Sequence, residues 1–297
     1  MTVNSKLQRH LPRAALALSA AMACLGSAAA EPLHREYLNG ATHAVLGGGG
    51  ANVTFSAGPD GLFFVDSGAR RDAADVLDLA KEVSDAPVRY LVNTHAHPEH
   101  TGGNARFGKA GAVIVAHEEV RDVIAADSSG SQDSALPVIT LSELGRVSFD
   151  FNDETIEVFH VAPAHSPGNV IVHFAESNVI HVGALFSPIS YPTITGGTVE
   201  AWIGALNEAV RSANFETRVV PSSGPVSDRE GLIAYREMLI AVRERVIEAL
   251  DRGQTLEQFV ATRPTREFDA RYGDPSNALF LPVVYREMSL RRQPAGE

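Results

Sequence analysis

The sequence predicts an α/β fold in which two β-sheets pack face to face and helices cover their outer surfaces. Short runs with strand character come in pairs both early and late in the chain, and segments with helical spacing separate them. The 297 residues are 44% hydrophobic and 21% charged, without a low-complexity tract. This composition is typical of a globular protein with one large domain or two small ones.

The first half of the chain alternates between strand and helix patterns. Apolar residues at positions 77, 80 and 83 recur at helical spacing, which predicts a helix over 73–83. Pro59, Asp60 and Gly61 supply the residue types of a turn between two strands. The other expected elements are strands over 51–57, 62–65, 89–92 and 113–115 and a helix over 118–126.

The second half predicts two hairpins and then a helical region. The hairpins pair 147–151 with 155–161 and 170–174 with 178–182. A helix over 199–214, a strand over 218–220 and a long helix over 228–251 follow. After Gly253 we expect a small helical tail, in which Thr255 and Ser276 are suited to be N-caps.

The first 30 residues have the three parts of a secretory signal peptide. Lys6, Arg9 and Arg13 precede an apolar run over 14–23, and small residues end at Ala30. The apolar run is too short to cross a membrane. A buried N-terminal helix and a lipoprotein anchor at Cys24 are the alternatives, and both fit the pattern less well. We therefore expect a periplasmic or secreted protein with a main domain over 31–250 and a helical extension over 251–297.

Removal of this peptide limits the partners and ligands of the mature protein. The 25 basic residues fall to 22 against 36 acidic ones, so the formal charge becomes −14. A protein this acidic is not expected to bind nucleic acid or an anionic membrane through bulk electrostatics. The only cysteine is also lost, so any metal must be held by nitrogen and oxygen ligands.

The stretch N-T-H-A-H-P-E-H-T-G-G-N, over 93–104, carries the strongest chemical signal. His95 and His97 follow a strand, and residues two apart in an extended chain point the same way. Pro98 then favours a helical turn, which would direct His100 towards the other two histidines. Clustered imidazoles are typical ligands of a transition metal, and zinc is the ion we expect here. The alternative is a set of hydrogen-bonded loop histidines.

This stretch resembles the H-x-H-x-D-H motif of the metallo-β-lactamase superfamily of hydrolases. The resemblance covers about residues 40–245 and includes V-D-S-G at 65–68, P-A-H-S-P-G at 163–168 and N-V-I-H-V-G at 178–183. It implies a four-layer αββα sandwich with metal-binding loops along one edge of the paired sheets. Asp66, in the first of these motifs, resembles a residue that supports the metal ligands.

The resemblance implies a complete first metal site and a damaged second one. His95, His97 and His165 match the ligands of the first ion. For the second ion, the motif aspartate is replaced by Glu99 and the third histidine is His100. The bridging aspartate is replaced by Ala184, and the last histidine, within Ser222-Ser223-Gly224, by Ser223. Alanine has no donor atom and serine is a poor ligand beside imidazole, so we expect one zinc ion and a weak or absent second site.

The activity that the resemblance implies is hydrolysis of a small-molecule substrate, such as an amide, lactam, lactone, ester or thioester, in which zinc-bound hydroxide attacks the carbonyl. Glu99 would accept or deliver the proton, and Tyr191, in a loop ahead of two glycines, is a candidate donor to the leaving group or an ordinary packed tyrosine. β-Lactam hydrolysis has no special support, because no cysteine is available and Ser223 stands where the remaining subclass uses histidine.

Two alternatives to this enzyme stay open. The chain could be a relative that has lost catalysis and binds a metal or ligand as a sensor, carrier or scaffold. It could also bind two metals by recruiting His181 or Glu176. His117, His160 and His173 lie in strand or helix patterns and are interpreted as packed or surface residues. The sequence does not indicate the oligomeric state.

Overall fold

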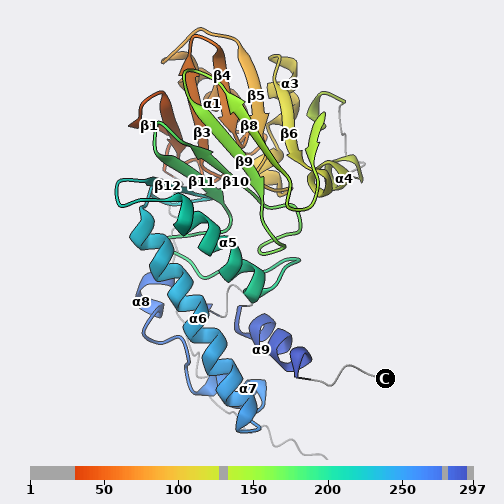
Figure 1. Cartoon of the computed structure of the whole chain (residues 1–297), viewed down its shortest axis with the longest axis vertical. Coiled ribbons are helices and arrows are strands. Elements are labelled where there is room, and N and C mark those ends of the chain that lie inside the picture. The colour runs from red at the N-terminus through yellow and green to blue at the C-terminus, as the bar shows by residue number, and fades with distance from the viewer. Residues whose placement is uncertain (1–30, 127–132, 276–279, 293–297) are drawn as a thin grey trace, which may run out of the picture.

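A computed structural model describes residues 31–126, 133–275 and 280–292. The expected signal peptide and the expected N-cap Ser276 lie outside these residues. Among the described residues, no helix combines the length and the apolar character needed to cross a membrane. The elements form two sheets with helices on both outer sides (Figure 1).

The first sheet has seven strands in sequential order. An antiparallel meander over β1–β4 continues into a parallel set from β4 to β7. The strands are β1 His34–Asn39, β2 Thr42–Leu46, β3 Val53–Gly58, β4 Gly61–Val65, β5 Val88–Val92, β6 Val113–His117 and β7 Ile139–Leu141. Helices on its outer face are α1 Ala73–Lys81, α3 Asn104–Lys109 and α4 Glu118–Ala126.

The second sheet has five strands in the order β12-β11-β10-β9-β8. Its hairpins are antiparallel as expected, and β12 pairs with β11 in parallel. The strands are β8 Arg146–Asp150, β9 Thr155–His160, β10 Val170–Phe174, β11 Val179–Gly183 and β12 Arg218–Pro221. Its outer face is covered by α5 Val199–Ser212 and α6 Arg229–Asp251 (Figure 1).

Three apolar layers hold the sandwich together. Phe64 and Phe107 belong to the layer between the first sheet and its helices, and Phe63 and Phe174 to the layer between the sheets. The third layer, around Trp202, joins the second sheet to the helices that cover it. This arrangement is the αββα sandwich predicted from the sequence.

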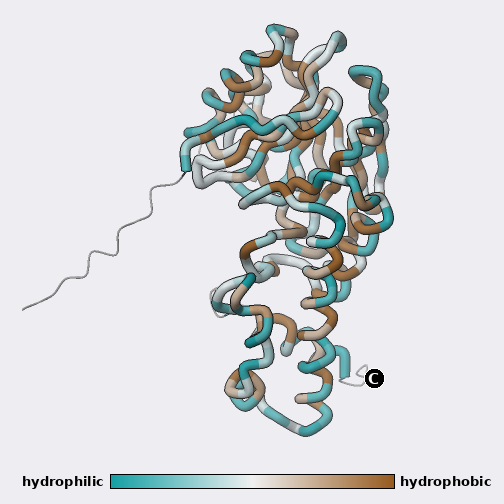
Figure 2. The backbone as a smooth tube through the Cα atoms, turned by 90° about the vertical axis from the view of Figure 1, so that its left-hand side faces the viewer, coloured by the Kyte–Doolittle hydropathy of each residue, from teal (hydrophilic) through white to brown (hydrophobic). Residues whose placement is uncertain are grey.

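The described part of the C-terminal region is helical, as predicted. It contains α7 Leu256–Ala261, α8 Asp269–Tyr272 and α9 Phe280–Arg291, which pack beside α6. Thr255 is the N-cap of α7 and forms a capping box with Gln258. Figure 2 shows this helical region extending away from the sandwich, with hydrophobic positions recurring along its helices.

The sequence prediction missed β1, β2 and β7. Of the six residues of β1, only Leu38 is buried, because this strand forms the edge of the sheet. Its polar composition therefore gives no alternating signal. The opposite edge strand, β7, has three residues, of which two are exposed. Helix α5 also ends at Ser212, two residues before its expected end.

Candidate metal centre

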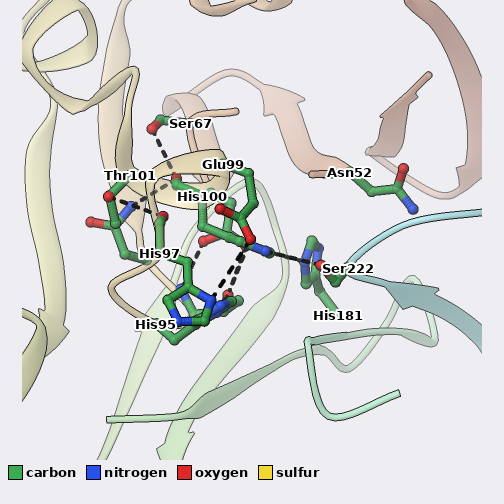
Figure 3. A network of polar contacts seen from close by, with 12 residues as sticks. Asn52, Ser67, His95, His97, Glu99, His100, Thr101, His181 and Ser222 are labelled. Atoms are coloured by element: carbon green, nitrogen blue, oxygen red, sulfur yellow. Dashed lines mark hydrogen bonds and ion pairs between the residues drawn. The ribbon is translucent and has the colours of Figure 1, made fainter. Parts of the chain in front are cut away.

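Two loops from different sheets meet at one edge of the sandwich and bring three histidines together. The first loop leaves β5 at Val92 and carries His95 and His97. His97 is the N-cap of the short helix α2, Pro98–Thr101, which begins at proline as the sequence predicts. The second loop, between β9 and β10, carries His165. Figure 3 shows the first of these loops at close range.

The three rings face a common point. Their centroids are 4.7 Å apart for His95 and His97, 4.9 Å for His95 and His165, and 4.7 Å for His97 and His165. One ring nitrogen from each lies within 4.8 Å of the others. The structure therefore brings together the three residues that the sequence analysis assigned to the first ion.

His165 is held in one orientation by its surroundings. Its Nδ1 donates to the carbonyl oxygen of Thr193 at 2.6 Å, which leaves the Nε2 lone pair directed at the other histidines. The indole of Trp202 packs edge-on at 5.9 Å between ring centroids. Burial lowers the pKa of His165 to about 4, although the Thr193 carbonyl opposes the shift. His165 is thus a neutral imidazole at neutral pH, as a metal ligand must be.

His95 provides the test of whether a metal fits. Its ring is fully buried, and its Nε2 has no hydrogen-bond partner among the described residues. Its Nδ1 lies 3.1 Å from the hydroxyl of Thr94. Burial and then the nearby His100 lower its pKa well below the usual value. A buried, neutral ring nitrogen without a partner, beside two other imidazoles, fits a transition-metal ion.

Glu99 lies at the open side of this cluster. Its Oε1 is 3.7 Å from Nδ1 of His97, and its side chain is 47% exposed. Burial lowers the pKa of His97, and the negative charge of Glu99 partly opposes this. The carboxylate is therefore placed to exchange protons with solvent and with a group bound at the histidines.

His100 has both ring nitrogens engaged by protein groups. Its Nδ1 lies 2.6 Å from Oδ2 of Asp66. Its Nε2 lies 3.0 Å from Oγ of Ser222, a contact that Figure 3 shows. Thr94 donates to Asp66 through both its backbone N–H and its hydroxyl, each at 2.8 Å. This network supports the neighbouring histidines, as the resemblance implied for Asp66.

A second group of donors is present but incomplete. His95, Glu99 and His100 also offer ligand atoms within 4.8 Å of one another. This group shares His95 with the first, and its His100 nitrogens are already engaged. Ala184 adds no donor atom. The second group therefore consists of three candidate ligands, one of which it shares with the first group.

Tyr191 does not direct its hydroxyl at the histidines. The oxygen lies 2.8 Å from Oδ1 of Asp269 and 3.2 Å from the carbonyl oxygen of Thr265, both in the C-terminal helical region. Its ring packs on Phe280. Burial raises its pKa above the usual range. The contacts are those of a packed tyrosine that ties the helical region to the sandwich.

The remaining histidines lie apart from the three-histidine cluster. His117 and His160 stack on each other with centroids 4.0 Å apart, and His173 pairs with Glu157. His181 lies 2.8 Å from the Thr54 hydroxyl and 3.5 Å from Asp66. Among the described residues, neither candidate metal group includes His181 or Glu176.

A cavity of about 260 Å³ opens beside the cluster. His97, Glu99 and His165 form one side, and Phe186 and Tyr235 supply aromatic surface. Other lining residues include Ala184, Ser222, Ser223 and Tyr191. The cavity can hold a small organic group against the histidines.

Sequence reasoning missed Thr94, Thr193 and Ser222. Thr94 stands directly before His95, and its position in the motif was the only available signal. Thr193 and Ser222 act from loops that are distant in sequence. The family motif makes Ser223 the counterpart of the missing histidine. In the structure, the Ser222 hydroxyl lies against His100 and the Ser223 side chain is exposed.

A family model described as the metallo-beta-lactamase superfamily matches residues 46–247. The fold agrees with a metallo-beta-lactamase from Pontibacter korlensis (19% identity, TM-score 0.60), over 70% of this chain and 99% of the other. It also agrees with the stereoselective inverting sec-alkylsulfatase Pisa1 from Pseudomonas sp. (16% identity, TM-score 0.70), over 89% of this chain and 51% of the other.

Two curated relatives match parts of the sequence. The 2,4-dinitroanisole O-demethylase subunit alpha from Nocardioides sp. (strain JS1661) is 28% identical over 39% of this chain and 35% of the relative. A linear primary-alkylsulfatase from Pseudomonas sp. (strain ATCC 19151) is 22% identical over 58% of this chain and 41% of the relative. The matched regions span less than half the length of either relative.

Proposed function

Because this chain belongs to the metallo-β-lactamase superfamily, we propose that it is a metal-dependent hydrolase with one ion on His95, His97 and His165. The observation that carries this proposal is the buried Nε2 of His95, which has no partner beside two other imidazoles. Zinc is the metal that best suits three nitrogen ligands with no thiolate.

When bound, such an ion supplies an activated water at neutral pH and polarises the bond to be broken. Residues of the protein transfer the proton and hold the metal ligands in place. Glu99, half exposed at the mouth of the cavity, takes a proton from water on its carboxylate and returns it to the leaving group. Thr193 and Trp202 hold the ring of His165 in place.

The substrate class we propose is an ester-type molecule with a small apolar group. The cavity beside the histidines has room for such a group, and Phe186 and Tyr235 form its apolar surface. Carboxylic esters, lactones and thioesters fit this description. The similarity to two alkylsulfatases adds sulfate esters to the candidates, because those relatives are named for that reaction.

A second candidate function is a non-catalytic metal or ligand binder. The observation that favours it is the incomplete second donor set, in which His100 is engaged by Asp66 and Ser222. A substrate panel separates the two. The zinc-loaded chain over 31–297 is incubated with a 4-nitrophenyl ester, a lactone, a thioester, an alkyl sulfate and nitrocefin.

We expect turnover of at least one ester-type compound. The turnover rate should fall by a factor of about 10³ or more in His165→Ala. His173→Ala is the matched control, because His173 pairs with Glu157 and belongs to neither candidate metal group. Metal uptake without turnover of any compound would favour the binder. Equal turnover together with equal metal content in His165→Ala and the unsubstituted chain would reject the metal site.

We also propose export, on the strength of the tripartite pattern over residues 1–30. Expression of the full chain in a Gram-negative host should give a periplasmic protein. Its intact mass should match a chain that begins at Glu31. A cytoplasmic protein that retains residues 1–30 would contradict this.

A further inference from the structure

Asp66, His100 and Ser222 form a linear series of hydrogen-bonded groups. Oδ2 of Asp66 lies 2.6 Å from Nδ1 of His100. Nε2 of His100 lies 3.0 Å from Oγ of Ser222, a contact that Figure 3 shows. Both distances are those of good hydrogen bonds. The same order of carboxylate, imidazole and hydroxyl activates the nucleophile in serine hydrolases.

The hydrogen bonds fix where the protons lie. Asp66 already accepts from the N–H and the hydroxyl of Thr94, which stabilises its ionised form. An ionised Asp66 requires the proton of His100 to sit on Nδ1. The Nε2 lone pair then accepts the hydroxyl proton of Ser222.

Ser222 is the member of the series that a substrate can reach. It follows the last residue of β12 and lines the cavity that also contains His97 and His165. Its backbone is fixed, because its N–H donates to Gly183 at 2.9 Å and its carbonyl accepts from the N–H of Asn52 at 2.7 Å. Asp66 and the His100 ring are fully buried, so Ser222 alone presents the series to the cavity.

We propose that Ser222 is a nucleophile for ester substrates, with His100 as its base and Asp66 as the residue that positions His100. Oγ of Ser222 forms a bond to the carbonyl carbon while its proton moves to Nε2 of His100. The bond to the leaving alkoxide breaks, and the alkoxide takes that proton and departs as an alcohol. Water then attacks the acyl-serine with the same proton transfers, which releases the acid and restores Ser222.

This proposal goes beyond the metal-dependent reaction, because it predicts a covalent intermediate on a side chain of the protein. A hydrogen bond that merely satisfies the buried His100 would give no such intermediate. Ser223 offers a matched control. It lines the same cavity one residue away, and no hydrogen bond of its hydroxyl is present among the described residues.

The test is covalent labelling of the chain over 31–297 as purified, with its metal content measured. Diisopropyl fluorophosphate is the probe, intact mass is the readout, and peptide mapping locates the adduct. We expect about one adduct per chain on Ser222, absent in Ser222→Ala and retained in Ser223→Ala. Thermal unfolding checks that each variant is folded.

A second measurement applies if the probe is too bulky for the cavity. With 4-nitrophenyl acetate, an acyl-enzyme gives a burst of about one nitrophenol per chain, which Ser222→Ala should abolish. Absence of both adduct and burst in the unsubstituted chain overturns the proposal, as does labelling that persists in Ser222→Ala. Turnover that survives in Ser222→Ala but not in His165→Ala keeps the proposed metal-dependent function and rejects this one.

Discussion

Nε2 of His165 lies 3.2 Å from Nδ1 of His97, although 68 residues separate them in sequence. The two rings come from loops that leave different sheets, so the contact exists only once the sandwich has formed. Two neutral imidazoles with facing nitrogens stabilise each other little by themselves. The arrangement places a nitrogen of each ring, together with one of His95, where the three could coordinate one ion.

The first prediction concerns the metal content. The chain over 31–297 should bind about one zinc ion tightly, and His165→Ala should lower this toward none, because two histidine ligands rarely hold zinc. Metal analysis after dialysis against a weak chelator measures the number of zinc ions per chain. His160→Ala is the control, since His160 contacts the same loop through the Pro167 carbonyl at 2.8 Å without joining the cluster. Two tightly held ions would contradict the donor count.

Local sequence spacing was enough to predict one part of this site. His95 and His97 lie two residues apart after a strand, and that geometry depends only on the backbone. His165 could be assigned through the family resemblance, since nothing near position 165 fixes its distance from position 95. The αββα order could likewise be predicted from paired strand patterns, whereas the polar edge strand β1 could not.

The contacts that orient the site could not be predicted. Thr193 accepts from His165, and Ser222 meets His100, through loops whose positions depend on packing of the whole second sheet. The family motif makes Ser223 the counterpart of the missing histidine, and the neighbouring Ser222 is the residue whose hydroxyl lies against His100. A one-residue shift in a loop leaves the sequence pattern almost unchanged but decides which hydroxyl reaches the imidazole.

Tyr191→Phe should test the alternative roles of this residue. Removing the hydroxyl breaks the 2.8 Å hydrogen bond to Asp269, and bonds to charged groups contribute about 1.5–3 kcal/mol. We expect a lower free energy of unfolding in urea and a kcat/KM within about threefold of the unsubstituted chain. A loss of kcat by a factor of about 10² with unchanged stability would restore the interpretation of Tyr191 as a donor to the leaving group.

His117 should make the protein sensitive to mild acid. Burial lowers its pKa below 6.5, as does repulsion from His160, while Glu118, Glu119 and Glu143 oppose the shift. As the pH falls through 6.5, the unfolded chain binds a proton at His117 that the folded chain does not. The free energy of unfolding should therefore decrease with falling pH, and it should decrease less in His117→Gln.

Urea unfolding at pH 7.5 and pH 5.5, about one unit on either side of the ordinary histidine pKa, measures this effect. The chelated protein is used for both chains so that loss of metal does not contribute. His34→Gln controls for removal of an imidazole from an edge strand. Equal pH dependence in His117→Gln and the unsubstituted chain would show that His117 does not remain neutral in the fold.

The last prediction concerns restoration of the second metal site. Ala184 and Ser222 both line the cavity, and Ser222 lies against Nε2 of His100. Ala184→Asp with Ser222→His should add two donors there and raise zinc uptake from about one to about two ions per chain. Ala184→Asp with Ser223→His is the control, and it should gain less because the Ser223 side chain is exposed. The first pair should also lose the covalent adduct, whereas the control should keep it. If the Ser223→His pair instead gains the ion, the motif alignment is correct and His100 does not depend on Ser222.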